Sequence, residues 1–196
     1  MSRLVLERRA AVADILQKRG DALVVTGLGS PTWDVAAAGD SPFNFYLWGA
    51  MGGAAMVGLG LALSQPQRRV VVVTGDGELL MGLGSLATIG ANRTSNLSIV
   101  VLDNEHYGET GMQESHTALG TDLAGIAAAA GFASTATIYT SEELAAWVPV
   151  IYSGQGPLLG VVKVLPSQPA LRVPARDGTY IKTRFREALL GAKAFE

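Results

Sequence analysis

The chain has 196 residues, a formal net charge of −2 and 48% hydrophobic residues, which suits one domain with a sizeable core. The near-neutral charge excludes a strongly basic nucleic-acid-binding surface. The sequence contains no cysteine, which excludes disulfides, thiolate metal sites and a cysteine nucleophile. We find no apolar stretch of transmembrane length and no signal peptide, so we expect a cytoplasmic protein.

Apolar runs of helical and strand character alternate along the first half of the chain. Leu4, Ala11, Ile15 and Leu16 share one face of the first expected helix, which is amphipathic. In chain order, we predict a helix over 5–18, a strand over 22–26, a turn over 27–31, a short strand over 45–48, a helix over 50–63, a strand over 70–74 and a helix over 78–91.

The second half continues the alternation, and prolines at 166, 169 and 174 mark an extended tail. We predict a strand over 97–102, a polar loop over 104–121, a helix over 122–130 with Asp122 as its N-cap, a strand over 136–139, a helix from 141 through 147, a strand over 158–164 and a helix over 178–190. Residues 1–196 are therefore interpreted as a single domain that ends in a Pro-containing tail and C-terminal helix over 166–196. The alternation predicts an α/β fold, a doubly wound parallel sheet with helices on both faces.

Two of the predicted strands end in polar residues. Gly75-Asp76-Gly77 follows one strand, and Asp103-Asn104 follows the next. Ligands bind at the carboxyl ends of the strands in such sheets, and Mg²⁺ prefers oxygen ligands together with phosphate oxygens and water. The glycines allow backbone N–H groups to approach phosphate closely, and the helix predicted from Glu78 aims its N-terminus at them. The sequence therefore predicts a Mg²⁺-diphosphate site.

The Gly-Asp-Gly triplet, the length of the spacer and the asparagine after the second strand resemble the cofactor signature of thiamine diphosphate enzymes. The resemblance implies that Asp76, Asn104 and the backbone carbonyl of His106 are Mg²⁺ ligands. Asp103 stands where most members have a first asparagine, a mild departure because the second residue of the pair is the ligand. The residues implied to bind the cofactor are Gly27, Gly49, Met51, Gly75, Asp76, Gly77, Glu78, Asn104, His106, Tyr107 and Gly108. Gly27 either contacts the diphosphate or only forms a tight turn.

The stretch from Trp48 to Gly53 resembles the segment that holds the aminopyrimidine ring in decarboxylases of this family. The resemblance implies that the carbonyl of Gly49 accepts from the 4′-amino group, and that Met51 wedges beneath the bend between the two rings. An unbranched methionine suits this role because it can fill an irregular gap. The alternative interpretation is that the glycines only permit close helix packing, with Met51 in the core.

Residues 49–132 look most like phosphonopyruvate decarboxylases and the beta subunits of sulfopyruvate decarboxylases. The segments that carry this resemblance are 59–63, 84–90, 95–97, 102–104 and 124–132. It implies decarboxylation of a pyruvate that carries an anionic group at C3, giving an aldehyde. Two alternatives stay open: a subunit of a carboligase or another 2-oxoacid enzyme, and a non-catalytic cofactor-binding assembly subunit. A nucleotide-binding module is disfavoured because neither GxxxxGK[ST] nor GxGxxG is present.

Full decarboxylases of this family have a second domain, which supplies a glutamate to the pyrimidine ring. This chain has room for one such domain and no good candidate for that glutamate. We therefore expect a separate alpha subunit with the pyrimidine-binding domain, a hetero-oligomer and an active site between chains.

Three polar side chains of the loop over 104–121 have alternative roles at the predicted site. The side chain of His106 is either a loop contact or a proton donor. Glu109 is expected near the thiazolium, although a carboxylate there would repel an anionic substrate. His116, with Gln113 and Ser115, either binds the anionic tail of the substrate or forms a plain surface loop.

Overall fold

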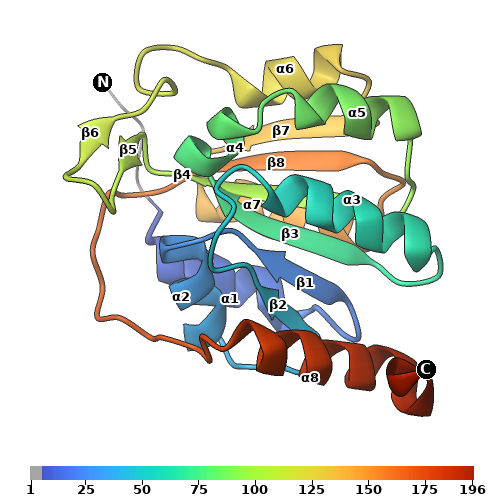
Figure 1. Cartoon of the computed structure of the whole chain (residues 1–196). Helices are drawn as coiled ribbons and strands as arrows, with labels where there is room; N and C mark the ends of the chain where they lie inside the picture. Colours follow the sequence, from blue (N-terminus) through green and yellow to red (C-terminus); the bar gives the residue numbers. More distant parts are fainter. Residues whose placement is uncertain (1–5) are drawn as a thin grey trace.

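Six parallel strands form a central sheet in the order β2-β1-β3-β4-β8-β7 (Figure 1). The computed structural model describes residues 6–196, so the part of the first predicted helix before Leu6 lies outside the described residues. The strands of the sheet are β1 Leu23–Thr26, β2 Asn44–Tyr46, β3 Val70–Gly75, β4 Leu97–Asp103, β7 Ser134–Ile138 and β8 Leu158–Lys163. All neighbouring strands pair in parallel, as predicted.

Helices cover both faces of this sheet (Figure 1). The helices are α1 Arg8–Gln17, α2 Ser30–Ala37, α3 Ala54–Ser64, α4 Asp76–Met81, α5 Ser85–Asn92, α6 Leu123–Ala129, α7 Ser141–Ser153, α8 Gly178–Leu190 and the 3₁₀ helix η1 Gly191–Phe195. One buried apolar cluster joins α3, α5 and α6 to one face, and a second joins α1, α2 and α7 to the other. The prediction of a doubly wound α/β fold is confirmed.

The prediction of one helix over 78–91 is wrong, because two short helices, α4 and α5, occupy this segment. The break falls at Gly82, whose added Cβ would lie 2.2 Å from the carbonyl oxygen of Gly52. The backbone before α3 thus packs directly against the turn between α4 and α5. Only glycine permits this approach, and the turn it requires interrupts the helix.

Other boundaries differ from the predictions for local reasons. The helix predicted from residue 50 begins at Ala54, because Ala50 and Gly52 have positive φ angles of 55° and 90°. The segment predicted to end at 147 continues to Ser153 through Pro149, because Val148 and Ile151 stay buried against the sheet. The strand predicted over 45–48 is β2, one residue earlier in its start and two in its end.

Three features were not predicted at all, and one of them is η1, which directly follows α8. The α2 helix follows the turn over 27–31, and Pro31 lies in its first turn, where proline is well tolerated. Within the loop predicted over 104–121, β5 His106–Tyr107 and β6 Gln113–Glu114 pair as a small antiparallel hairpin.

The C-terminal segment returns to the β2 edge of the sheet (Figure 1). The helix predicted over 178–190 is α8. The Phe185 ring meets Phe45 edge-on at a centroid separation of 5.5 Å. Arg184 donates to the carboxylate of Asp40 at 2.6 Å and to the carbonyl oxygen of Asn44 at 3.2 Å. These contacts cover an edge strand that would otherwise present unpaired backbone groups.

Within residues 6–196, no helix is both long enough and apolar enough to cross a membrane.

Two glycines of α3 provide a matched test of this packing. An added Cβ at Gly58 would lie 2.2 Å from Cγ2 of Val72, whereas Gly60 has nothing within 4 Å. We expect Gly58→Ala to lower the free energy of unfolding by about 1–3 kcal/mol through overpacking. Gly60→Ala should raise it by about 0.5–1 kcal/mol, because alanine is the better helix former. Urea denaturation of both variants measures the difference, and equal effects would contradict the packing described.

Candidate active site

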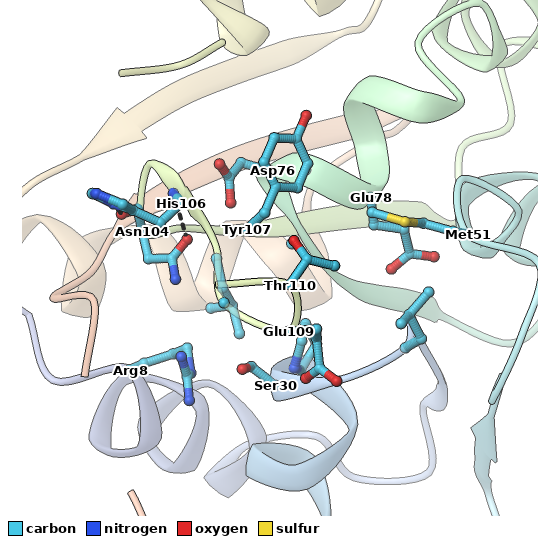
Figure 2. Close-up of a pocket in the computed structure, with 16 residues that line it drawn as sticks. Arg8, Ser30, Met51, Asp76, Glu78, Asn104, His106, Tyr107, Glu109 and Thr110 are labelled. Atoms are coloured by element: carbon cyan, nitrogen blue, oxygen red, sulfur yellow. Dashed lines mark hydrogen bonds between the residues drawn. The ribbon is translucent and has the colours of Figure 1, made fainter. Parts of the chain in front are cut away.

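A cavity of about 160 Å³ opens at the carboxyl ends of β3 and β4 (Figure 2). It brings together most of the site residues that the sequence predicted. The predicted residues that line it are Met51, Gly75, Asp76, Gly77, Glu78, Asn104, His106, Tyr107, Gly108 and Glu109. Gly27 and Gly49 do not line this cavity.

Asp76, at the start of α4, is held by hydroxyl groups from a distant loop. Its Oδ2 accepts from Ser115 Oγ at 2.5 Å and from Thr117 Oγ1 at 3.2 Å. Burial and then the charge of Asp103 raise the pKa of the Asp76 carboxyl to about 6, and the two hydroxyls partly offset this rise. A buried carboxylate whose charged form is disfavoured in this way is suited to pairing with a cation.

Asp103 ends β4 as a second buried carboxylate and is neutralised across the sheet. Lys163 of β8 is its partner in the strand register, and Lys163 Nζ lies 2.8 Å from Asp103 Oδ2. The same ammonium contacts Glu105 Oε1 at 2.8 Å. Thr117 Oγ1 donates to Asp103 Oδ1 at 2.8 Å. Thr117 therefore lies between the two carboxylates, with Asp76 on one side and Asp103 on the other.

Asn104 begins the loop that leads into β5, and its own side chain shapes this loop. The backbone N–H of His106 donates to Asn104 Oδ1 at 3.0 Å, while His106 Nδ1 lies 2.8 Å from the Asn104 carbonyl oxygen. Glu105 between them has a positive φ of 64°. This geometry favours the loop contact as the role of the His106 side chain. Asn104 Oδ1 retains a second lone pair that can bind a cation.

Gly27 is required for a steric reason that neither expectation for it, a diphosphate contact or only a tight turn, includes. An added Cβ there would lie 1.4 Å from Glu78 Oε2, so the missing side chain makes room for this carboxylate. Glu78 is buried and its Oε2 accepts from Thr74 Oγ1 at 2.8 Å. Burial raises the pKa of Glu78, and the hydrogen bond from Thr74 opposes the rise.

Met51 lies at the end of the cavity away from Asn104 (Figure 2). Met51 is 39% exposed, so the alternative interpretation of Met51 as a core residue is wrong. Gly49 is exposed, with nothing within 4 Å of an added Cβ. Close packing does explain Gly52, which meets Gly82. The close-packing interpretation therefore holds for Gly52 but not for Met51, and the role of this segment in holding the aminopyrimidine ring stays a prediction.

Sequence reasoning missed several residues of the site. The additional cavity-lining residues are Arg8, Leu28, Ser30, Pro31, Leu102 and Thr110. The sequence groups Ser115 with His116 as either a contact to the substrate or a plain surface loop, yet Ser115 is buried and donates to Asp76, whereas His116 is exposed. The alternation of buried Ser115, exposed His116 and buried Thr117 follows a hydroxyl-x-hydroxyl pattern, which was the only local signal available.

The donor set fits a magnesium ion bound together with a diphosphate. Among residues 6–196, no group of three or more His, Asp or Glu side chains could hold a metal by itself. Mg²⁺ commonly takes one or two protein ligands and completes its shell with phosphate oxygens and water. Asp76 and Asn104 line one cavity and match that requirement. Gly77 also lines this cavity, and an added Cβ there would lie 2.5 Å from the Tyr107 ring. Because Gly77 has no side chain, the ring packs directly against its backbone.

Comparison with known proteins relates this chain to one family of enzymes and to its fold. Residues 29–162 match the family described as thiamine pyrophosphate enzyme, C-terminal TPP binding domain. The chain is 39% identical to sulfopyruvate decarboxylase subunit beta of Methanothermobacter thermautotrophicus, over 96% of this chain and 98% of that protein. It is 39% identical to phosphonopyruvate decarboxylase of Streptomyces viridochromogenes, over 85% of this chain but 42% of that protein. The structure of benzoylformate decarboxylase from Polynucleobacter necessarius matches with a TM-score of 0.70 and 21% identity, over 85% of this chain and 34% of that chain, which supports the fold.

The ion pair behind the site can be tested through stability. We expect Lys163→Met to lower the free energy of unfolding by about 3 kcal/mol, because Asp103 would stay buried without its counter-ion. Adding Asp103→Asn should recover most of this loss, since no uncompensated charge is then buried there. Urea denaturation of the single and double variants provides the measurement. A loss below about 1 kcal/mol, or no recovery in the double variant, would contradict a buried charge pair.

Proposed function

This chain belongs to the thiamine pyrophosphate enzyme family, and we propose that it is the beta subunit of a split, Mg²⁺-dependent 2-oxoacid decarboxylase. The proposed substrate is a 3-substituted pyruvate of the sulfopyruvate or phosphonopyruvate type, converted to an aldehyde. The observation that carries this proposal is the shared cavity of Asp76 and Asn104 at the ends of β3 and β4.

In this proposal Asp76, Asn104 and the His106 carbonyl hold Mg²⁺, and the metal neutralises the diphosphate. When bound, thiamine diphosphate supplies the electron sink that decarboxylation of a 2-oxoacid requires. Ser115 and Thr117 fix the rotamer of Asp76 by occupying its Oδ2. Burial keeps water away from the carboxylate, which strengthens its attraction to a cation.

Met51 is proposed to contact the ring portion of the cofactor from the opposite end of the cavity. The loop that carries Met51 is fixed by the contact between Gly52 and Gly82, next to α4. Asp76 begins the same helix. The position of Met51 is therefore tied to the proposed metal ligand through one rigid connection.

A partner chain is proposed to complete the site. The chain corresponds to nearly the whole of a named beta subunit but to less than half of the phosphonopyruvate decarboxylase. Met51, Met56 and Met81 are 39%, 41% and 65% exposed. These flexible apolar side chains, on the α3 and α4 side of the cavity, suit burial against another chain. We propose an alpha subunit with the pyrimidine-binding domain and the activating glutamate as the occupant.

Glu109 is the feature that bears on the substrate class. Its side chain lines the cavity and is exposed. Burial raises the pKa of its carboxyl, and the charge of Arg8 lowers it. A solvated carboxylate of this kind is screened, so it does not by itself exclude an anionic substrate.

The proposed reaction can be tested by reconstitution. We expect the chain purified with its alpha partner to release CO₂ from sulfopyruvate or phosphonopyruvate in a screen of 2-oxoacids. The single chain should stay far below an ordinary turnover of about 1–10³ s⁻¹, because the proposed alpha subunit supplies the pyrimidine-binding half. Ordinary turnover by the single chain would contradict the split enzyme. Failure of the assembled complex on every 2-oxoacid would contradict decarboxylation.

The proposed metal site can be tested by cofactor binding. We expect Asp76→Ala to abolish Mg²⁺-dependent binding of thiamine diphosphate to the assembled enzyme while leaving the fold intact, because removal of a buried carboxylate relieves its desolvation. Glu114→Ala, which removes an exposed carboxylate outside the cavity, is the matched control and should leave binding unchanged. Isothermal titration with and without Mg²⁺ measures both. Unchanged affinity in Asp76→Ala would contradict the site assignment.

A further inference from the structure

Arg8 is a buried cation beside the candidate active site. It begins α1, is 4% exposed and lines both the candidate active-site cavity and an adjoining cavity of about 420 Å³. Its Nε donates to Asp34 Oδ2 in α2, and its Nη1 donates to the carbonyl oxygen of Ser167 at 3.3 Å. No hydrogen bond joins its Nη2 to a described residue. The guanidinium is therefore fixed in position while part of its donor capacity is unused.

The ion pairs around Asp34 leave positive charge at the cavity. Asp34 is fully buried and is shared by Arg8 and Arg9, whose Nε lies 3.1 Å from Asp34 Oδ1. Two guanidinium groups thus face one carboxylate. Glu109 is close enough for the Arg8 charge to act on it, but it is exposed and forms no ion pair with Arg8 in the described part of the chain. Burial of an incompletely neutralised arginine is costly, and an anionic ligand would offset this cost.

The position of Arg8 in the cavity identifies the kind of anion. Figure 2 shows Arg8 on the side of Asn104 and His106, with Met51 and Glu78 on the other side. If Met51 contacts the rings of the cofactor, the reacting end of the site lies away from Arg8. The Arg8 end is the one that carries the proposed metal ligand Asn104, where the diphosphate is expected.

We propose that Arg8 binds the terminal phosphate of thiamine diphosphate through its guanidinium, with Asp34 as the positioning residue. This inference rests on the proposed function. A planar guanidinium can donate two parallel hydrogen bonds to a phosphate. Asp34 occupies Nε and so fixes the orientation of the fork toward the cavity. Arg8 also links α1 to the tail through Ser167, so the phosphate site includes a segment that lies far away in the sequence.

Arg9 provides a matched control for this proposal. It shares Asp34 and donates to the tail carbonyl of Ala170 at 2.9 Å, but it does not line the candidate active-site cavity.

The experiment titrates thiamine diphosphate and thiamine monophosphate, each with Mg²⁺, into the full-length chain in the assembly in which it is purified. Arg8→Gln should weaken thiamine diphosphate about 10- to 100-fold, the loss of a charged hydrogen bond. Thiamine monophosphate, which lacks the terminal phosphate, should change much less. Arg9→Gln should leave both affinities nearly unchanged.

The ratio of the two affinities distinguishes binding from structural damage, because partial unfolding would weaken both ligands together. Arg8→Lys, which keeps the charge without the fork, should give an intermediate ratio. If Arg8→Gln leaves the ratio of thiamine diphosphate affinity to thiamine monophosphate affinity unchanged, the proposal is overturned. If this unchanged ratio comes with a raised KM for the 2-oxoacid, Arg8 is assigned to the substrate instead. Absence of thiamine diphosphate binding by the unsubstituted assembly overturns the proposed function as well. Normal binding there combined with an unaltered Arg8→Gln ratio overturns the role of Arg8 alone.

Discussion

Two buried carboxylates at the ends of neighbouring strands constrain the carboxyl edge of the sheet. Asp76 and Asp103 cannot both be charged at low cost in so dry a place. Thr117 lies between them as a shared hydrogen-bond partner, Lys163 neutralises Asp103, and Asp76 is left with the raised pKa. The unbalanced charge is therefore concentrated on the residue that faces the cavity. A cation bound at this point would neutralise the Asp76 carboxylate, which has no cationic partner among the described residues.

Missing side chains determine how the rest of the site is assembled around this pair. Gly27 leaves room for the Glu78 carboxylate, and Gly52 and Gly82 bring the Met51 loop onto the end of α4. Because Asp76 is the first residue of α4, this packing also fixes the position of the Met51 loop relative to Asp76. Close backbone packing of this kind leaves little freedom for the two ends of the cavity to move apart.

The opposite wall of the cavity is held by long-range ionic contacts. The fully buried Asp34 joins α1 to α2, and its two arginine partners reach carbonyl groups of the tail at Ser167 and Ala170. The cavity thus has acidic groups around Asp76 and a fixed cation at Arg8. This polarity suits a ligand that combines a divalent cation with an anionic diphosphate.

The sequence by itself determined the fold class, the strands that end at the site and the position of Asp76 and Asn104 directly after two of these strands. These features depend on local signals: apolar runs, glycine turns and the spacing between two strand ends. Only the tertiary structure placed the hydroxyl groups of Ser115 and Thr117 within hydrogen-bond distance of Asp76. These two residues lie 39 and 41 positions after Asp76 in the sequence. The same holds for the break between α4 and α5 and for Arg8 at the cavity. Such contacts depend on how distant segments close on one another, and a buried hydroxyl or arginine has no periodic pattern that marks its partner in the sequence.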